Sequence, residues 1–220
     1  EALYEKMGNA IEVSGGSAAN TIAGLCALGG KGAFIGKVRD DQLGNAFTRD
    51  IHAIGVHFDT LSKAVETPTA RSLIFVTPDA ERTMQTFLGA CVELGPDDID
   101  TDLISKSAVT YLEGYLWDPP KAKEAFLKAA QAADSSGRKV ALSLSDPFCV
   151  DRHRYEFLDL VTKHVNILFA NEEEIKSLYQ VDSFDEALQR VRGHCDMAAL
   201  TRGDRGSVIV AGEDIHLVDA

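Results

Sequence analysis

The stretch Val13-Ser-Gly-Gly-Ser-Ala-Ala-Asn-Thr-Ile-Ala-Gly-Leu-Cys-Ala-Leu-Gly-Gly30 decides how the rest of the chain is interpreted. The β-branched residues of the run from Ile11 to Val13 predict a short strand, and the paired glycines at 15 and 16 predict a tight turn. Small residues with Ala, Leu and Ile at helical spacing follow, and they predict a helix. The stretch therefore predicts a strand, a tight turn and a helix in succession.

The turn between this strand and helix is suited to binding hydroxyl groups. Adjacent glycines let a ligand approach the backbone closely, and the start of a helix presents free N–H groups and the positive end of its dipole. Asn20, one turn into the helix, offers a donor and an acceptor. We therefore interpret Gly15, Gly16 and Asn20 as a site for a polyol such as a sugar or a ribose. The alternative is that Ser14 or Ser17 caps a core helix whose glycines serve packing.

The composition is that of an ordinary soluble globular protein. The 220 residues are 45% hydrophobic and 25% charged, which is enough for one sizeable α/β domain. No apolar run reaches the roughly 18 residues of a membrane span, and no leader opens the chain, so we expect a cytoplasmic protein with no membrane partner. The formal net charge of −12 argues against a general affinity for nucleic acid. The four cysteines lie far apart and the six histidines form no HExxH pair, so no structural metal is predicted.

Strand-like and helix-like segments alternate along the chain. The predicted strands are 32–36, 108–113, 139–144, 165–170, 197–201 and 207–211. The predicted helices are 45–55, one opened by Pro96, 119–135, 152–163 and one or two within 172–193. This alternation predicts a mostly parallel sheet covered on both faces, whose ligands gather beyond the carboxyl ends of the strands. Two β-like runs around a polar turn within 56–90 predict a hairpin that forms a separate small sheet.

Three strand ends carry candidate chemistry. Asn171-Glu-Glu-Glu174 starts a helix, where a phosphate can bind and where Asn171 and Glu174 can hold a hydrated Mg²⁺; the alternative is an ordinary helix cap. Thr201-Arg-Gly-Asp-Arg-Gly-Ser207 contains Gly203 and Gly206, whose amides could face nucleotide phosphates; the alternative is a plain hairpin connection. Asp146, before a proline, could line the same crevice, but an Asp-Pro turn is the favoured interpretation.

Several enzyme classes lose their sequence support. The run Gly32-Ala-Phe-Ile-Gly-Lys-Val38 is too short for a Walker P-loop and lacks its Ser or Thr. No GxGxxG follows a strand, which disfavours a dinucleotide-dependent oxidoreductase. No GxSxG elbow is present, which weakens a hydrolase interpretation.

The motifs together resemble the ribokinase (PfkB) superfamily of sugar and nucleoside kinases. The resemblance rests on four separate motifs: Gly15-Gly-Ser-Ala-Ala-Asn20, Phe34-Ile-Gly-Lys-Val-Arg-Asp-Asp-Gln-Leu-Gly44, Asn171-x-x-Glu174 and Thr201-x-Gly-x-x-Gly206. Glu81-Arg-Thr-Met-Gln-Thr-Phe-Leu-Gly-Ala90 and the segment Leu142-Ser-Leu-Ser-Asp-Pro-Phe148 look closest to the adenosine kinase branch. The fold implied is a three-layer αβα ribokinase-like domain spanning 1–220, with a small β-sheet lid from about 1–14 and 56–90.

The resemblance also implies roles for individual residues. Gly15, Gly16 and Asn20 would bind substrate hydroxyls, with Met84 and Thr86 facing the substrate from the lid. Arg82 would be a catalytic lid arginine that meets the transferring phosphate. Asn171 and Glu174 would organise Mg²⁺ and the phosphates of ATP, and Thr201, Gly203 and Gly206 would lie beside the nucleotide. An exposed lid sheet could pair with a second copy as a homodimer.

The chain departs from the family pattern at both ends. The Gly-Ala-Gly-Asp segment, which carries the family's anion hole and catalytic aspartate, is absent from the 220 residues, and so is the N-terminal strand with its substrate-binding aspartate. Arg39 stands where a glycine is frequent. We therefore expect a fragment of a longer kinase that is inactive, or nearly so, on its own.

The function expected is ATP- and Mg²⁺-dependent phosphorylation of a primary hydroxyl of a sugar or ribonucleoside, with an adenosine-like substrate favoured. A ribokinase- or fructokinase-type sugar kinase is one alternative. A non-catalytic nucleoside- or sugar-binding protein derived from such a kinase is another.

Overall fold

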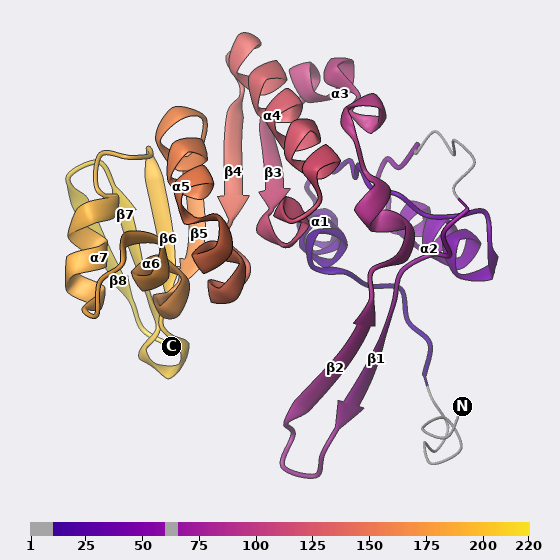
Figure 1. Ribbon diagram of the computed structural model, residues 1–220, viewed down its shortest axis with the longest axis horizontal. Coiled ribbons are helices and arrows are strands. Elements are labelled where there is room, and N and C mark those ends of the chain that lie inside the picture. The colour runs from indigo at the N-terminus through magenta and orange to yellow at the C-terminus, as the bar shows by residue number, and fades with distance from the viewer. Residues whose placement is uncertain (1–10, 60–65) are drawn as a thin grey trace.

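A six-stranded sheet forms the centre of the computed structural model, which describes residues 11–59 and 66–220 (Figure 1). In spatial order the strands are β3 (Val109–Glu113), β4 (Lys139–Ser143), β5 (Ile167–Asn171), β6 (Met197–Thr201), β7 (Ser207–Ala211) and β8 (Asp214–Val218). Strands β3 to β6 are mutually parallel, whereas β7 and β8 each pair antiparallel with the strand before them. The mostly parallel α/β sheet is confirmed, and β8 is a strand that the sequence analysis did not predict.

Helices pack on the sheet because its central strands consist mostly of apolar residues. Leu168, Ala170 and Leu200 belong to one buried cluster with side chains from α4 (Pro120–Ser135), α5 (Pro147–Lys163), α6 (Glu172–Tyr179) and α7 (Phe184–Val191). Side chains at the alternate positions of these strands point to the other face of the sheet. There Phe169 and Met197 remain 41% and 39% exposed. On that second face α1 (Ser17–Ala27) contacts β3, and the Thr21 side chain hydrogen-bonds to the Tyr111 hydroxyl.

The N-terminal part contains α1 and α2 (Gln42–Ala53), both close to their predicted positions. The strand predicted over 11–13 is wrong: these residues adopt no regular structure, and Ile11 is 88% exposed. The strand predicted over 32–36 is also wrong, since only Ala33 forms an isolated bridge, with His57. β-branched residues favour extended backbone, but a strand forms only where another strand pairs with it.

A two-stranded antiparallel sheet projects from the main body (Figure 1). It consists of β1 (Arg71–Val76) and β2 (Arg82–Phe87), as the predicted hairpin within 56–90 requires. Of the remainder of the predicted lid, residues 11–14 form no strand and residues 1–10 lie outside the described part of the chain. The hairpin leads into a buried 3₁₀ turn, Gly89–Glu93, where a Cβ on Gly89 would lie 2.3 Å from the Pro68 carbonyl oxygen.

Helix α5 begins five residues earlier than predicted. Asp146 accepts a hydrogen bond from the Cys149 N–H at 3.0 Å, and Pro147 occupies the first turn, so the Asp-Pro turn interpretation is confirmed. His153 has non-helical backbone angles inside the helix, which accounts for a pattern that starts near 152. A short helix, α3 (Thr101–Lys106), precedes β3 after the turn opened by Pro96. Within residues 11–59 and 66–220, no helix combines the length and apolarity needed to cross a membrane.

Candidate functional site

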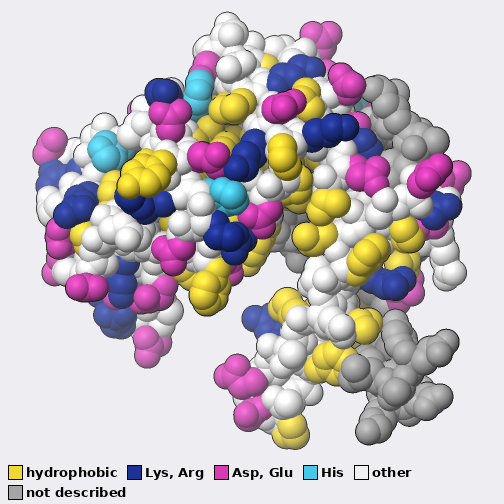
Figure 2. Space-filling model, viewed as in Figure 1, with side chains coloured by type: hydrophobic (Ala, Val, Ile, Leu, Met, Phe, Trp, Pro, Cys, Tyr) yellow, Lys and Arg dark blue, Asp and Glu magenta, His cyan; other side chains and the backbone are white. Residues whose placement is uncertain are grey.

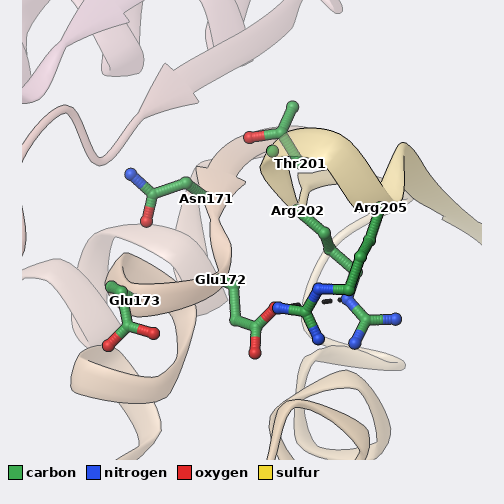
Figure 3. Close-up of a pocket in the computed structure, with 7 residues that line it drawn as sticks. Asn171, Glu172, Glu173, Thr201, Arg202 and Arg205 are labelled. Carbon is green, nitrogen blue, oxygen red and sulfur yellow. Dashed lines mark hydrogen bonds and ion pairs between the residues drawn. The ribbon is translucent and has the colours of Figure 1, made fainter. Parts of the chain in front are cut away.

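A cavity of about 230 Å³ lies where β5 and β6 end (Figure 3). Asn171 and Thr201 are register partners on these two strands, so the parallel pairing places the two sequence motifs that follow them side by side. The cavity is lined by Asn171, Glu172, Glu173, Thr201, Arg202, Gly203 and Arg205. The structure therefore brings together predicted site residues that lie 30 positions apart in the chain.

Asn171 and Glu174 form a reciprocal cap at the start of α6. The Asn171 side-chain oxygen accepts from the Glu174 N–H at 2.8 Å, while the Glu174 carboxylate accepts from the Asn171 N–H at 2.9 Å and from its side-chain amide at 2.7 Å. Asn171 and Glu174 therefore do cap the helix, as the alternative interpretation of this motif predicted. Across the described residues, no group of three or more His, Cys, Asp or Glu side chains is arranged to hold a metal ion.

Glu174 is nevertheless an unusual capping residue. Its side chain is buried, and burial raises the pKa of its carboxyl. The hydrogen bond from the Asn171 backbone opposes this shift, whereas the nearby charges of Asp146 and Glu113 raise the pKa further. The charges of Glu113, at the end of β3, and Asp146, just after β4, therefore act on the Glu174 carboxyl in the first turn of α6.

The two predicted glycines of the β6–β7 connection have different surroundings. Both have positive φ, 61° at Gly203 and 78° at Gly206. A Cβ on Gly206 would lie 2.0 Å from the Val218 carbonyl oxygen, so its absence is required by packing against the end of β8. A Cβ on Gly203 would meet no atom within 4 Å, so this glycine leaves open space beside the cavity.

The start of α1 is open, as the sequence analysis expected of a binding turn. Gly16 is the N-terminal capping residue, with φ of 122°, and no side chain caps the helix. Ser14 instead donates a hydrogen bond to Asp50 at 2.6 Å. The alternative in which Ser14 or Ser17 caps α1 is therefore wrong. Asn20 is exposed, and a Cβ on Gly15 would lie 3.8 Å from its side-chain oxygen.

A buried carboxylate at the end of β3 links α1 to this edge of the sheet. Glu113 accepts hydrogen bonds from the Tyr111 hydroxyl, at 3.1 Å, and from the Ser145 hydroxyl. Tyr111 in turn contacts Thr21 of α1; burial, followed by the charge of Glu113, raises its pKa to about 12. The start of α1 and the cavity thus lie along one edge, with the end of β4 between them (Figure 1). Sequence reasoning missed Glu113, although an acid that ends an apolar strand was a visible signal.

The three predicted lid residues share one face of the hairpin. Arg82, Met84 and Thr86 alternate along β2, so their side chains point the same way, and all three are exposed. Their register partners on β1 are Val76, Ile74 and Ser72. The hydroxyls of Thr86 and Ser72 lie 2.8 Å apart. The hairpin therefore presents one cationic, one apolar and one hydroxyl side chain in a row.

Comparison with known proteins identifies the family of the chain. The profile of the pfkB family carbohydrate kinases matches residues 6–220. The chain belongs to this family. The chain is also similar to the 5-dehydro-2-deoxygluconokinase of Clostridium perfringens. The two are 30% identical over 188 residues, which cover 78% of this chain and 54% of that protein.

Two solved structures are much more similar to this pfkB chain. A probable sugar kinase protein from Rhizobium etli CFN 42 is 55% identical with a TM-score of 0.93, and the adenosine kinase from Sinorhizobium meliloti is 54% identical with a TM-score of 0.92. Each alignment covers 100% of this chain and 67% of the other. The pfkB chain thus spans about half to two thirds of the length of such relatives.

Proposed function

We propose that the protein carrying this chain transfers the terminal phosphoryl group of ATP, with Mg²⁺, to a primary hydroxyl of a ribonucleoside or sugar. Membership of the carbohydrate kinase family supports a kinase acting on such small molecules. The observation that carries the proposal further is the pairing of Asn171 with Thr201 around a cavity at the carboxyl edge of the sheet. The open start of α1, on the same edge, is the corresponding place for the acceptor.

The proposed roles follow from what each group offers. The backbone N–H groups of Gly15 and Gly16, in the turn before α1, and the Asn20 side-chain amide would bind acceptor hydroxyls. Thr201 and the open space at Gly203 would receive the nucleotide, and Gly206 would keep the connection folded beside it. Glu113, buried at the strand end nearest α1, is a further acceptor for a substrate hydroxyl.

Oxygen ligands near Glu174 suit a hydrated Mg²⁺. Burial, and after it the charges of Asp146 and Glu113, raise the pKa of Glu174. A bound cation would offset the repulsion among these charges, so the carboxylate of Glu174 and the amide oxygen of Asn171 would hold the metal through water. Bound Mg²⁺ would neutralise phosphate charge, which phosphoryl transfer requires together with accurate positioning. Asn171 would orient the Glu174 carboxylate, and the lid residue Arg82 would supply a further positive charge.

An adenosine-like acceptor is favoured. The lid face that carries Met84 also carries Ile74 and Val76. The side chains of Met84, Ile74 and Val76 are 54%, 48% and 65% exposed, respectively. An apolar face of this kind suits a nucleobase better than a free sugar. The adenosine kinase of Sinorhizobium meliloti supports the same choice. The Rhizobium etli and Clostridium perfringens proteins favour a sugar kinase as the second candidate.

A coupled ATPase assay of the full-length protein with adenosine, ribose and fructose tests these candidates. We expect turnover with adenosine to exceed that with either sugar. Turnover with a sugar alone would select the sugar kinase. Tight binding of ligands without turnover would select the non-catalytic binding protein. The 220 residues by themselves are expected to be inactive, because they lack the Gly-Ala-Gly-Asp segment that carries the general base and the anion-hole donors of the family. Each of these contributes about 10²-fold or more in rate.

The same proposal covers the partners and location of the protein. We expect a cytoplasmic enzyme whose partners are its small-molecule substrates rather than nucleic acid or membrane. Exposed apolar side chains on the hairpin would favour pairing of two lids in a homodimer. Light scattering of the full-length protein at several concentrations measures its mass in solution, which should be that of two chains if the lids pair.

A further inference from the structure

We infer that Glu172 is a positioning residue that holds the β6–β7 connection against the start of α6 and so sets the shape of the nucleotide cavity before the nucleotide binds. This inference rests on the proposed function, because it concerns the same cavity. Glu172 is absent from the roles that family resemblance assigns to Asn171, Glu174, Thr201, Gly203 and Gly206. Its own contacts carry the argument.

Glu172 joins two elements that are far apart in sequence. One of its carboxylate oxygens accepts from Arg202 Nε at 3.2 Å and from the Arg205 guanidinium (Figure 3). Arg202 and Arg205 flank Gly203 and lie 30 and 33 positions after Glu172. A single carboxylate therefore binds Arg202 and Arg205, one on each side of Gly203 in the turn that lines the cavity.

The partial burial of Glu172 and Arg202 makes their ion pair stronger than a typical surface pair, whereas Arg205 is 57% exposed. The Glu172 side chain is only 17% exposed, and that of Arg202 is 24% exposed. The Arg202 guanidinium also lies 4.1 Å from the centre of the Phe184 ring on α7, which limits its orientations. Exposed ion pairs contribute little, whereas partly buried networks with fixed geometry contribute more.

The turn needs such a contact because its backbone is permissive. Gly203 has a φ of 61°, and its Cβ position is open space, so neither sterics nor packing at this residue determines the path of the turn. Three backbone hydrogen bonds close the turn on itself: from the Arg202 N–H to the Gly206 carbonyl at 2.8 Å, from the Arg205 N–H to the Arg202 carbonyl at 3.2 Å and from the Gly206 N–H to the Gly203 carbonyl at 3.2 Å. All three stay within the turn, so none of them joins it to α6. Among the described residues that line this cavity, Glu172 is the one whose side chain joins the turn to α6, through its hydrogen bonds with Arg202 and Arg205.

Calorimetric binding of Mg·ADP and of adenosine to the full-length protein tests the inference. We compare Glu172→Gln with Glu186→Gln, a control that removes a more exposed Arg–Glu ion pair within α7, with Arg190 at 2.6 Å. For Glu172→Gln we expect about tenfold weaker binding of Mg·ADP and adenosine binding within about twofold of the wild type. The control should leave both affinities within about twofold. Glu172→Asp, which keeps the charge, should restore part of the lost affinity.

The inference is overturned if Glu172→Gln binds Mg·ADP as tightly as the wild type. It is also overturned if Mg·ADP and adenosine affinities fall together, since that is the result of a general structural defect. Arg205→Ala combined with Glu172→Gln should lose no more affinity than either change alone; additive losses contradict the shared role. A wild-type protein that binds no Mg·ADP would instead refute the proposed function itself.

Discussion

At the scale of single residues, glycines with similar backbone angles have different reasons to be glycine. Gly206 lies against the carbonyl oxygen of Val218, whereas Gly203 borders open space beside the cavity. The first is required for folding of the strand pair, and the second is free to serve a ligand. Sequence analysis grouped both as nucleotide-binding, because a motif shows spacing and not surroundings.

Replacing each of these glycines with alanine separates the two reasons. Gly206→Ala adds a backbone clash to the cost of positive φ and should lower the free energy of unfolding by about 2–4 kcal/mol. Gly203→Ala carries only the conformational cost and should lower it by about 1–2 kcal/mol. Urea denaturation of the full-length variants measures the difference. Equal losses, or a larger loss at Gly203, would contradict the steric assignment.

Asn20 offers the cleanest residue-level test of the acceptor site. Its side chain is exposed at the start of an uncapped helix, so little stability depends on it. Asn20→Ala should raise KM for the acceptor about tenfold through loss of hydrogen bonds, with KM for ATP and the melting temperature nearly unchanged. Steady-state kinetics with both substrates varied gives this comparison. An unchanged acceptor KM would remove Asn20 from the site.

At the scale of elements, caps determine where helices begin and how they attach to their neighbours. Asp41 caps α2 by accepting from the Gly44 N–H at 2.9 Å, and its other oxygen accepts from the Thr69 N–H at 2.9 Å. Burial alone raises the pKa of Asp41, but the hydrogen bonds from Thr69 and Gly44 outweigh it and lower the pKa below 3.8. The carboxylate thus stabilises the native state in its charged form.

The lowered pKa of Asp41 predicts a pH-dependent contribution to stability. A depressed native pKa gives stability that is present above the unfolded value of 3.8 and is lost as the pH falls through the lowered native value. Asp41→Asn keeps a capping side chain but loses the charge that strengthens its hydrogen bonds, so it should cost about 1 kcal/mol at pH 7, and the difference from wild type should shrink below pH 4. Denaturant titrations at pH 7 and pH 3 check this. A difference that stays constant between these pH values would show that charge is irrelevant.

The hairpin element makes a prediction about catalysis. Arg82 shares an exposed face with Met84 and Thr86, whereas Arg71 lies on the opposite face, over the Phe87 ring. Arg82→Ala should lower kcat about 100-fold if it neutralises charge on the transferring phosphate. Arg71→Ala is the matched control and should change kcat by less than about threefold. Equal kcat values for Arg82→Ala and the wild type would exclude a role at the phosphate.

At the scale of the whole molecule, local patterns predicted the elements, and pairing decided which of them became strands. The apolar segments of β4 to β6 were readable because strands of a mostly parallel sheet are apolar along much of their length. The strand predicted over 11–13 failed because nothing in its own residues records whether a partner strand is present. Conversely, β8 was missed although Ile215 and Leu217 alternate with polar residues; in the structure this strand, Asp214–Val218, is exposed along its length.

The candidate site was predictable where single motifs carry its residues and not where long-range contacts do. Asn171 and Thr201 could be placed together because parallel strands end at one edge. An acid at the end of an apolar strand could have marked Glu113 only as a candidate, because its contacts depend on Ser145, 32 positions later, and on α1 approaching through Thr21. The partnership of Glu172 with two arginines likewise appears only in three dimensions.

The central claim is that the acceptor and the phosphate donor bind at one edge of the sheet and meet there. NMR relaxation of the protons next to the acceptor hydroxyl, measured in the full-length protein with Mn²⁺·ADP replacing Mg²⁺·ADP, tests it most directly. Our account predicts strongly enhanced relaxation of adenosine's ribose protons when both ligands are bound, lost on competition with excess Mg²⁺. Unenhanced relaxation with both ligands demonstrably bound would place the two sites apart and contradict the account.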